Sequence, residues 1–195
     1  MSNNSRFQNE ILTFWFGSPG QAEFGKPQPA WFRKNPDFDQ EICDRFSILY
    51  PQAAAGTLDP WQQTADGCLA LLLLLDQFPR NMFRGTPQAF ATDAQALAVA
   101  KYAVEQQFDQ QLLLVQRWFV YLPYEHSEEW DDQLRSLQLW QTLQNDPDSA
   151  SPIDYAQRHA DVIERFGRFP HRNQILGRQS TAEELIFLNQ PHSSF

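Results

Sequence analysis

The sequence predicts an all-α protein, and three observations lead to this prediction. Apolar residues recur at the spacing of one helical face, strand-type alternation is almost absent, and residues that start or stop helices are frequent. A run of leucines within residues 69–75 is apolar on every side, which is typical of a helix buried in the core. We therefore expect a helical protein organised around this segment.

Size and composition indicate a single domain that covers residues 1–195. A chain with 42% hydrophobic and 14% aromatic residues can bury a core, which argues against disorder. The net charge of -9 argues against nucleic acid and against an anionic membrane surface as partners.

Several features favour a cytoplasmic location. Residues 1–7 lack the basic and then apolar layout of a signal peptide. The apolar run at 69–75 is far shorter than a membrane span of about 20 residues. Cys43 and Cys68 lie among apolar helical neighbours, which suits reduced core thiols better than a disulfide or a zinc site.

Helix boundaries follow from capping residues and prolines. Asn35 and Asp59 each precede a proline at a first helical position, and residues 181–184 form a capping box. We expect Pro79 and Pro123 to end the helices before them. The result is about eight helices, at residues 5–16, 36 to between 50 and 55, 59–78, 92–107, 109–121, 127–145, 151–166 and 181–188.

Short loops favour antiparallel helix pairs, which would place the loops after the first, third, fifth and seventh helices at one end. That end would collect most of the cations of an acidic chain, and this pattern suits a site for a small anion or for an acidic segment of a partner protein. The alternative is that these cations only stabilise the ends of helices. The residues concerned are Lys26, Arg33, Lys34, Arg80, Arg84, Arg165, Arg168, Arg172 and Arg178.

Two of these loops look alike, because residues 77–81 and 168–173 both contain Phe-Pro and Arg-Asn. The likeness indicates either a duplicated unit or two supports for one pocket. The ligand-binding residues expected from these loops are Arg80, Asn81, Arg84, Arg168, His171, Arg172 and Asn173.

Asp76 ends the leucine run, where a carboxylate is costly unless a cation neutralises it. We expect Asp76 to be buried and paired with an arginine from one of these loops. As an alternative to a binding protein, Asp76, Glu125 and His126 could serve as the acid and base groups of a small-molecule enzyme. The simpler interpretation is that Glu125 complements the start of the next helix while His126 packs locally.

No motif predicts a metal or cofactor. His126, His159, His171 and His192 show no His-x-x-x-His or Glu-x-x-His spacing, and no glycine-rich phosphate loop is present. A third functional alternative is an interaction scaffold that presents a concave aromatic surface, formed by Trp31, Phe32, Trp118 and Phe119.

Three stretches of the chain resemble the signature segments of a bacterial family, domain of unknown function 924. They are residues 75–86, 121–128 and 165–173, and residues 11–17 and 31–32 fit as well. The resemblance implies an all-α fold similar to the tetratricopeptide-like superhelical class. It implies no reaction and assigns no catalytic residue.

Overall fold

The computed structural model describes residues 3–191 and 193–194, and this part of the chain contains helices and no strand. The all-α prediction is therefore confirmed, whereas the tetratricopeptide-like superhelical arrangement stays a prediction. His192 and the first two residues of the expected N-terminal segment lie outside the described residues. No helix among those described combines the length and the apolar character that a membrane crossing needs.

The N-terminal part consists of three helices, and a long loop with a single 3-10 turn joins the first helix to the second. Asn35 caps α2 as predicted, since its side chain accepts hydrogen bonds from the amides of Asp37 and Phe38 at 3.1 and 3.3 Å. The single helix expected from residue 36 onward is divided, because the chain leaves the helix at residues 47–48. The elements are α1 (Asn3–Phe16), the 3-10 turn η1 (Pro29–Trp31), α2 (Pro36–Phe46) and α3 (Leu49–Ala54).

The leucine run forms the central helix, and each residue from 69 to 75 is at most 2% exposed. The predicted turn at Pro79 is wrong, because the chain stays helical through a π turn. The amide of Phe78 bonds to the carbonyl of Leu73, five residues back. The carbonyl of Leu75, which loses its usual donor at Pro79, instead accepts the Thr92 hydroxyl at 2.6 Å. The elements are η2 (Asp59–Gln63), α4 (Ala65–Leu72), the π-helical η3 (Leu73–Gln77) and α5 (Phe78–Met82).

The next segment carries the second misplaced boundary. Pro123 lies inside α7 and does not end the helix. The helix expected at Ser127 begins three residues later, and the Ser127 hydroxyl accepts the amide of Glu129 at 3.2 Å and donates to Asp132 at 2.8 Å. The elements are η4 (Pro87–Phe90), α6 (Asp93–Glu105), η5 (Asp109–Gln111), α7 (Leu114–Glu125) and α8 (Trp130–Gln141).

The C-terminal part follows the predicted boundaries closely. Gly167 ends α9 in the left-handed conformation with φ at 66°. Thr181 and Glu184 form the predicted capping box, with reciprocal hydrogen bonds of 3.2 and 2.7 Å. The elements are η6 (Pro147–Ser149), α9 (Ala150–Phe166), η7 (Pro170–Arg172) and α10 (Ala182–Leu188).

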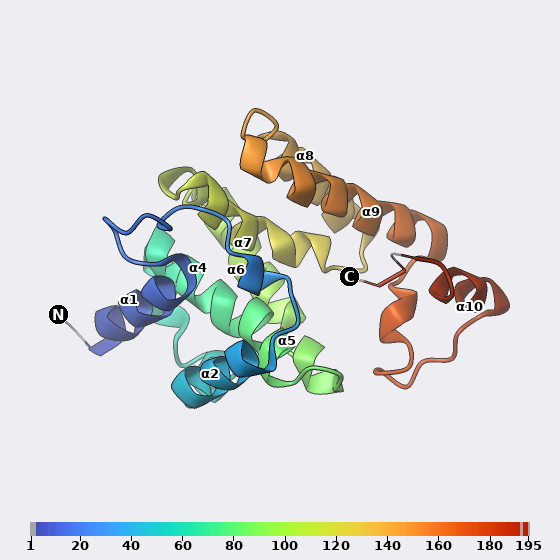
Figure 1. Ribbon diagram of the computed structural model, residues 1–195, viewed down its shortest axis with the longest axis horizontal. Coiled ribbons are helices and arrows are strands. Elements are labelled where there is room, and N and C mark those ends of the chain that lie inside the picture. Colours follow the sequence, from blue (N-terminus) through green and yellow to red (C-terminus); the bar gives the residue numbers. More distant parts are fainter. Residues whose placement is uncertain (1–2, 192, 195) are drawn as a thin grey trace.

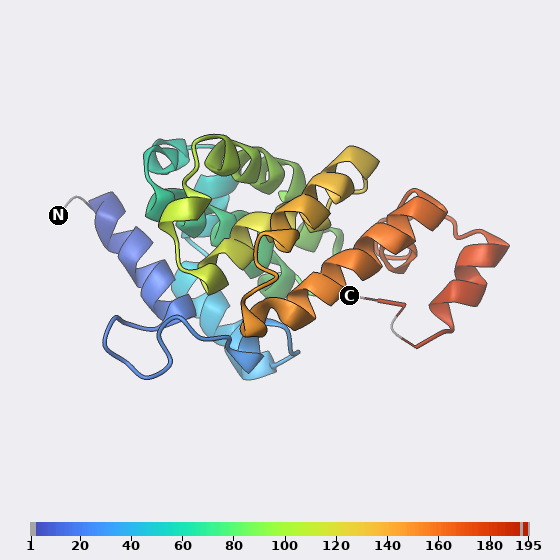
Figure 2. The ribbon, with the colours of Figure 1, turned by 90° about the horizontal axis from the view of Figure 1, so that it is seen from above.

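The helices pack around α4, which contacts α1, α6 and α7. The pair α8 and α9 runs along one side, and the segment with α10 lies at the end of the molecule farthest from the N-terminus (Figures 1 and 2). Trp31, Trp118 and Phe119 are core residues, at most 6% exposed, while Phe32 is 58% exposed. The predicted concave aromatic surface is therefore wrong, because Trp31, Trp118 and Phe119 pack on one another inside the protein and Phe32 is the one exposed ring of the four.

Candidate functional site

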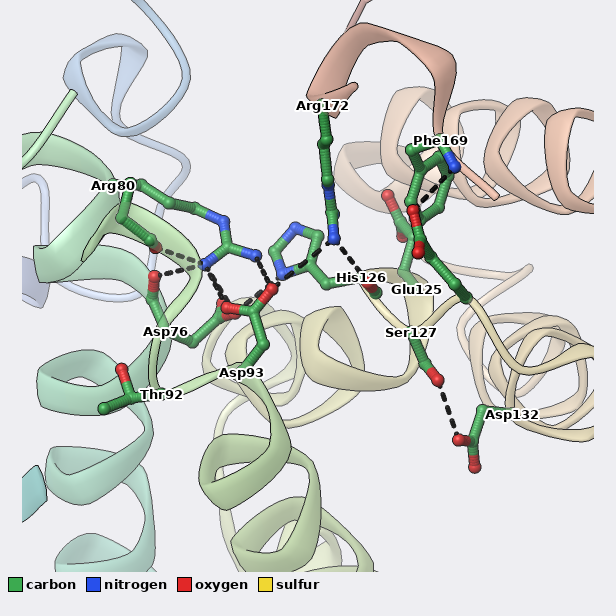
Figure 3. A network of polar contacts seen from close by, with 12 residues as sticks. Asp76, Arg80, Thr92, Asp93, Glu125, His126, Ser127, Asp132, Phe169 and Arg172 are labelled. Carbon is green, nitrogen blue, oxygen red and sulfur yellow. Dashed lines mark hydrogen bonds and ion pairs between the residues drawn. The ribbon is translucent and has the colours of Figure 1, made fainter. Parts of the chain in front are cut away.

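Three of the predicted loop regions meet, together with the start of α6, in one polar cluster. We call this cluster the Asp76 network, and it consists of Asp76, Arg80, Asp93, His126 and Arg172 (Figure 3). Its members come from the π turn and α5, from the N-terminus of α6, from the residue after α7, and from η7. The regions after the third, fifth and seventh helices therefore converge as predicted, whereas the loop after the first helix, expected at the same end, contributes no residue to this network.

Asp76 is the buried anion of the network, with 1% of its surface exposed. Its Oδ1 lies 2.7 Å from His126 Nδ1 and 3.2 Å from Arg80 Nη1, and Gln77 donates to Oδ2. Burial alone would raise the pKa of Asp76, but Arg80 and His126 outweigh burial and hold the pKa well below its usual range. The predicted burial and arginine pairing are confirmed, with Arg80 in helix α5 and not in a loop.

His126 is held in one orientation by this carboxylate. Burial, and then the positive charge of Arg80, lower the pKa of His126, so the ring is neutral near pH 7. Because an ionised carboxylate only accepts hydrogen bonds, the proton of the neutral ring lies on Nδ1. The other ring nitrogen, Nε2, then carries a lone pair and points between the guanidinium groups of Arg80 and Arg172 (Figure 3).

Asp93 joins the two arginines that come from the two similar Arg-Asn segments. Arg80 donates to both oxygens of Asp93 at 2.9 and 3.1 Å, and Arg172 Nη1 lies 3.5 Å from Oδ2. The predicted alternative of two supports for one pocket fits this geometry better than a duplicated unit, because Arg80 lies in α5 and Arg172 in a 3-10 turn. Sequence reasoning missed Asp93, whose only signal was its place in the first turn of α6.

Arg172 is a buried cation that lacks a close carboxylate partner. Its residue surface is 6% exposed, and its guanidinium carbon lies 4.9 and 4.4 Å from the ring centroids of Phe90 and Phe169. Nη1 donates to the carbonyl of His126 at 3.0 Å, whereas Nε has no hydrogen-bond partner among the described residues. Burial, and then the charge of Arg80, lower the pKa of Arg172 to about 10.

Asn81 and Arg84, two predicted ligand residues, lie outside the Asp76 network. Asn81 donates to Asp39 at 2.7 Å, and Arg84 makes a two-bond pair with the same carboxylate at 2.9 and 2.8 Å. Asp39 comes from α2, and sequence reasoning did not single it out. This group joins α2 to the segment after α5.

Arg168, Asn173 and Arg178 form a third group, in the C-terminal segment. Arg168 pairs with Glu184 at 2.6 and 2.8 Å. Arg178 pairs with Glu128 at 2.6 and 3.0 Å and also donates to Asn173 at 3.0 Å. Five of the nine cations expected at one common site are therefore divided among three groups, two of which are saturated by carboxylates, and Arg165 pairs instead with Glu183 at 2.8 Å. None of the ion pairs between described residues involves Lys26, Arg33 or Lys34.

His171, another predicted ligand residue, lies in η7 beside Arg172. Its ring centroid lies 5.7 Å from that of Phe169. Burial, and then the charge of Arg172, lower the pKa of His171 to about 3, so this imidazole is neutral near pH 7.

Glu125 is directed away from the Asp76 network, in contrast to its predicted role as an acid or base group beside His126. It is 2% exposed, and its Oε1 lies 2.9 Å from Nδ1 of His159 on α9. Its Oε2 has no hydrogen-bond partner among the described residues. His126 follows the last turn of α7 while Glu125 lies within it, so the two neighbouring side chains face different helices. No local sequence signal linked Glu125 to His159.

Two hollows in the surface lie away from the network. One, of about 220 Å³, is lined by residues that include Trp15, Trp31 and Phe38, and the other, of about 370 Å³, lies beside Lys101 and Trp130. In the part of the chain that the structure describes, no three His, Cys, Asp or Glu side chains are arranged to hold a metal ion.

A comparison with protein-family models identifies the family of this chain. Residues 11–192 match the family described as a bacterial protein of unknown function, DUF924. A solved structure of a protein of unknown function from Agrobacterium tumefaciens is 39% identical, with a TM-score of 0.85 over 96% of this chain and 99% of that chain. No curated protein matches. The chain therefore belongs to the bacterial DUF924 family.

Proposed function

We propose that the Asp76 network binds a small anionic molecule, a carboxylate or a phosphate, through the free edge of Arg172. The observation that carries this proposal is the buried Nε of Arg172, which has no hydrogen-bond partner among the described residues. An arginine that is buried without a close carboxylate destabilises the fold, because its desolvation is not offset by a strong ion pair. A bound anion would supply the missing partner.

The shape of the guanidinium group selects the ligand class. The edge formed by Nε and Nη2 presents two parallel N–H groups, which match the two oxygens of a carboxylate or phosphate. Nη1 is already engaged by the carbonyl of His126, which fixes the direction of this edge. Phe90 and Phe169 hold the guanidinium plane. The site is thus preorganised for two-bond recognition of an oxyanion.

The neighbouring groups support the same ligand class. Arg80 adds a second positive charge, and its side chain is 20% exposed, so the network reaches the surface. Nη1 and Nη2 of Arg80 already donate hydrogen bonds to the carboxylate of Asp93. Arg172 is therefore the arginine of the network with binding capacity left, and a ligand with a single anionic group satisfies it.

Arg84, Arg168 and Arg178 have a structural role in this proposal. Each makes a two-bond pair with a carboxylate that joins separate segments of the chain. This is the outcome expected if helix-end arginines hold elements together. The proposal for a ligand site therefore rests on Arg172, with Arg80 and His126 beside it.

A thermal-shift measurement with inorganic phosphate, malonate and succinate at constant ionic strength tests this function. At about a hundred times its dissociation constant, a ligand adds roughly 2.7 kcal/mol, or about 5 to 10 °C in melting temperature for a protein of this size. We expect at least one of these anions to stabilise the wild-type protein, and Arg172→Lys to lose that increment because lysine keeps the charge without the planar fork.

Arg84→Lys is the matched control, since it makes the same chemical change at a saturated arginine. It should keep the full ligand-induced increment. Equal increments in wild-type protein and Arg172→Lys, or none in the wild type, would overturn the proposal.

A cytoplasmic location is part of the same proposal. Cys43 and Cys68 are free thiols, and burial raises the pKa of Cys68 to about 12. Two free cysteines, one buried and one half-buried, suit a reducing compartment. Mass spectrometry after alkylation of the native and the unfolded protein should find both thiols reduced when the protein is isolated from cells.

A further inference from the structure

Asp76 and His126 together have the geometry of a general base beside the proposed anion site. The carboxylate fixes the ring through Nδ1 at 2.7 Å, and the carboxylate itself is anchored by Arg80 and Gln77. A histidine oriented in this way by a buried carboxylate presents Nε2 for proton transfer. The His126 side chain is 13% exposed, so the imidazole lies near the border of the protein and not deep in the core.

Nε2 also has a defined position relative to the two arginines. Nε2 lies between the guanidinium groups of Arg80 and Arg172 (Figure 3). An anionic group on the free edge of Arg172 would bring the adjacent atoms of the same molecule toward this nitrogen. The two cations would then stabilise negative charge that develops on an oxygen of that molecule.

We propose that His126 removes a proton from the carbon next to a carbonyl group of a small acid bound at Arg172. This inference rests on the proposed anion site. The C–H bond breaks, its electron pair passes to the carbonyl oxygen as an enolate, and the proton bonds to Nε2. Return of a proton from Nε2 to the same carbon restores the acid, so the net result is exchange of that hydrogen with solvent and no other reactant is needed.

The surroundings of His126 favour proton transfer over nucleophilic chemistry. The nearby hydroxyl of Ser127 is engaged by Asp132 at 2.8 Å. The charged and titratable groups around the ring are Asp76, Arg80, Asp93, His171 and the imidazole of His159, whose centroid is 6.2 Å away. Arg172 contacts the backbone carbonyl of His126. Asp76 stabilises the imidazolium that forms when Nε2 takes up a proton, and in this scheme it is a positioning residue.

Proton NMR in D2O measures the proposed reaction directly. Pyruvate and 2-oxoglutarate are incubated with the whole protein. The measured quantity is the rate at which the signal of the hydrogens on the carbon next to the carbonyl disappears. For an acid that stabilises the protein through Arg172, we expect exchange above the buffer rate, reduced by a factor of about a hundred or more in His126→Gln.

His159→Gln is the matched control, because His159 is likewise buried beside a carboxylate, Glu125, but belongs to no proposed site. His159→Gln should keep the exchange rate of the wild-type protein. An equal loss of exchange in His159→Gln and His126→Gln would overturn the assignment of His126 as the base. An acid that binds at Arg172 without any exchange would also overturn the base, while leaving the anion site intact. Absence of binding would instead contradict the proposed function.

The tautomer of His126 provides a readout that needs no substrate. Nitrogen–proton correlation spectra of the wild-type imidazole should show the proton on Nδ1 and a bare Nε2 near pH 7. Asp76→Asn should move the proton to Nε2, because the amide of asparagine can donate to Nδ1 where a carboxylate cannot. A protonated Nε2 in the wild-type protein would overturn the proposal independently of any ligand.

Discussion

At the scale of single residues, Asp76 connects the buried core to the polar network. Its carboxylate accepts from a histidine that follows α7 and pairs with Arg80 one helical turn away. The i and i+4 spacing of Asp76 and Arg80 made this pair readable from the sequence. The contact with His126, fifty positions along the chain, depends on the packing of α7 against the central helix.

Asp76→Ala is expected to destabilise the protein by about 3 to 5 kcal/mol, because it leaves Arg80 and His126 buried without their carboxylate. Urea unfolding followed by circular dichroism measures this loss. Asp39→Ala is the control, since the Asp39–Arg84 pair is more exposed and is worth at most about 1 kcal/mol. Similar losses in the two variants would show that Asp76 has no special structural role.

Two histidines, His126 and His171, should make the folded protein less stable as the pH falls. His126 and His171 have lowered pKa values in the folded protein, to about 3 for His171, whereas in the unfolded chain they titrate near 6.5. Below that pH the unfolded chain binds protons that the folded protein does not. The stability that these rings contribute is therefore fully present above about pH 6.5 and is lost as the pH falls toward the folded values.

We expect His171→Gln to flatten this dependence. Between pH 6 and pH 4, each such histidine should lower the free energy of unfolding by up to about 1.4 kcal/mol per pH unit. The slope of the variant should be smaller by the contribution of one histidine. Urea titrations at several pH values measure the slope. An unchanged slope in His171→Gln would show that this ring is protonated in the folded protein.

At the scale of elements, the π turn η3 explains how the central helix continues past Pro79. A proline removes the donor for the carbonyl four residues back, and Thr92 from the next segment supplies a substitute at 2.6 Å. The turn also places Asp76 in the cluster, in keeping with the frequent occurrence of π turns at functional sites. A polar group is thus brought to the site by a local break in helical regularity.

Thr92→Val should cost about 1 to 3 kcal/mol, because it leaves the buried carbonyl of Leu75 without its donor. Adding Pro79→Ala restores a backbone amide at the position that normally serves this carbonyl. We therefore expect the double variant to lose less stability than the sum of the two single variants, as measured by urea unfolding. Strict additivity would mean that the two substitutions do not act on the same carbonyl.

The same elements show what the sequence could and could not predict. Local signals placed the cap at Asn35, the left-handed end at Gly167 and the capping box at Thr181, because each acts within one turn of a helix. Prolines 79 and 123 were misread as helix ends, because interactions with distant residues or the packing of a whole helix can compensate for the missing amide. In the site, the contact of Asp93 with Arg80 and the Glu125–His159 pair could not be predicted, because each joins two elements whose proximity the sequence does not show.

At the scale of the whole molecule, the C-terminal segment is joined to the rest by fewer apolar contacts than the main core has. A small separate cluster holds it, formed by Val162, Ile163 and Phe169 with Phe166 and Phe187 packed against them. Glu128 adds polar contacts, since it accepts from Arg178 and from the amide of Phe169 at 2.8 Å. Arg172 lies on this segment, so the docking of the segment and the proposed site are coupled.

Hydrogen exchange should therefore reveal a C-terminal segment that opens at lower free energy than the leucine helix. Glu128→Gln weakens its attachment, and exchange in residues 170–190 should become faster while residues 69–75 remain unchanged. Mass spectrometry of peptic fragments resolves the two regions. Equal acceleration in both regions would show that the segment and the core open as one unit.

The proposed anion site is tested most directly at the atom on which it depends, Nε of Arg172. In nitrogen–proton spectra of the arginine side chains, the Nε–H signal of Arg172 is identified by its absence in Arg172→Lys. Titration with an anion that stabilises the protein should shift this signal to saturation and leave the Nε–H signal of Arg84, which already donates to Asp39, in place. An Arg172 signal that no such anion moves would contradict the account.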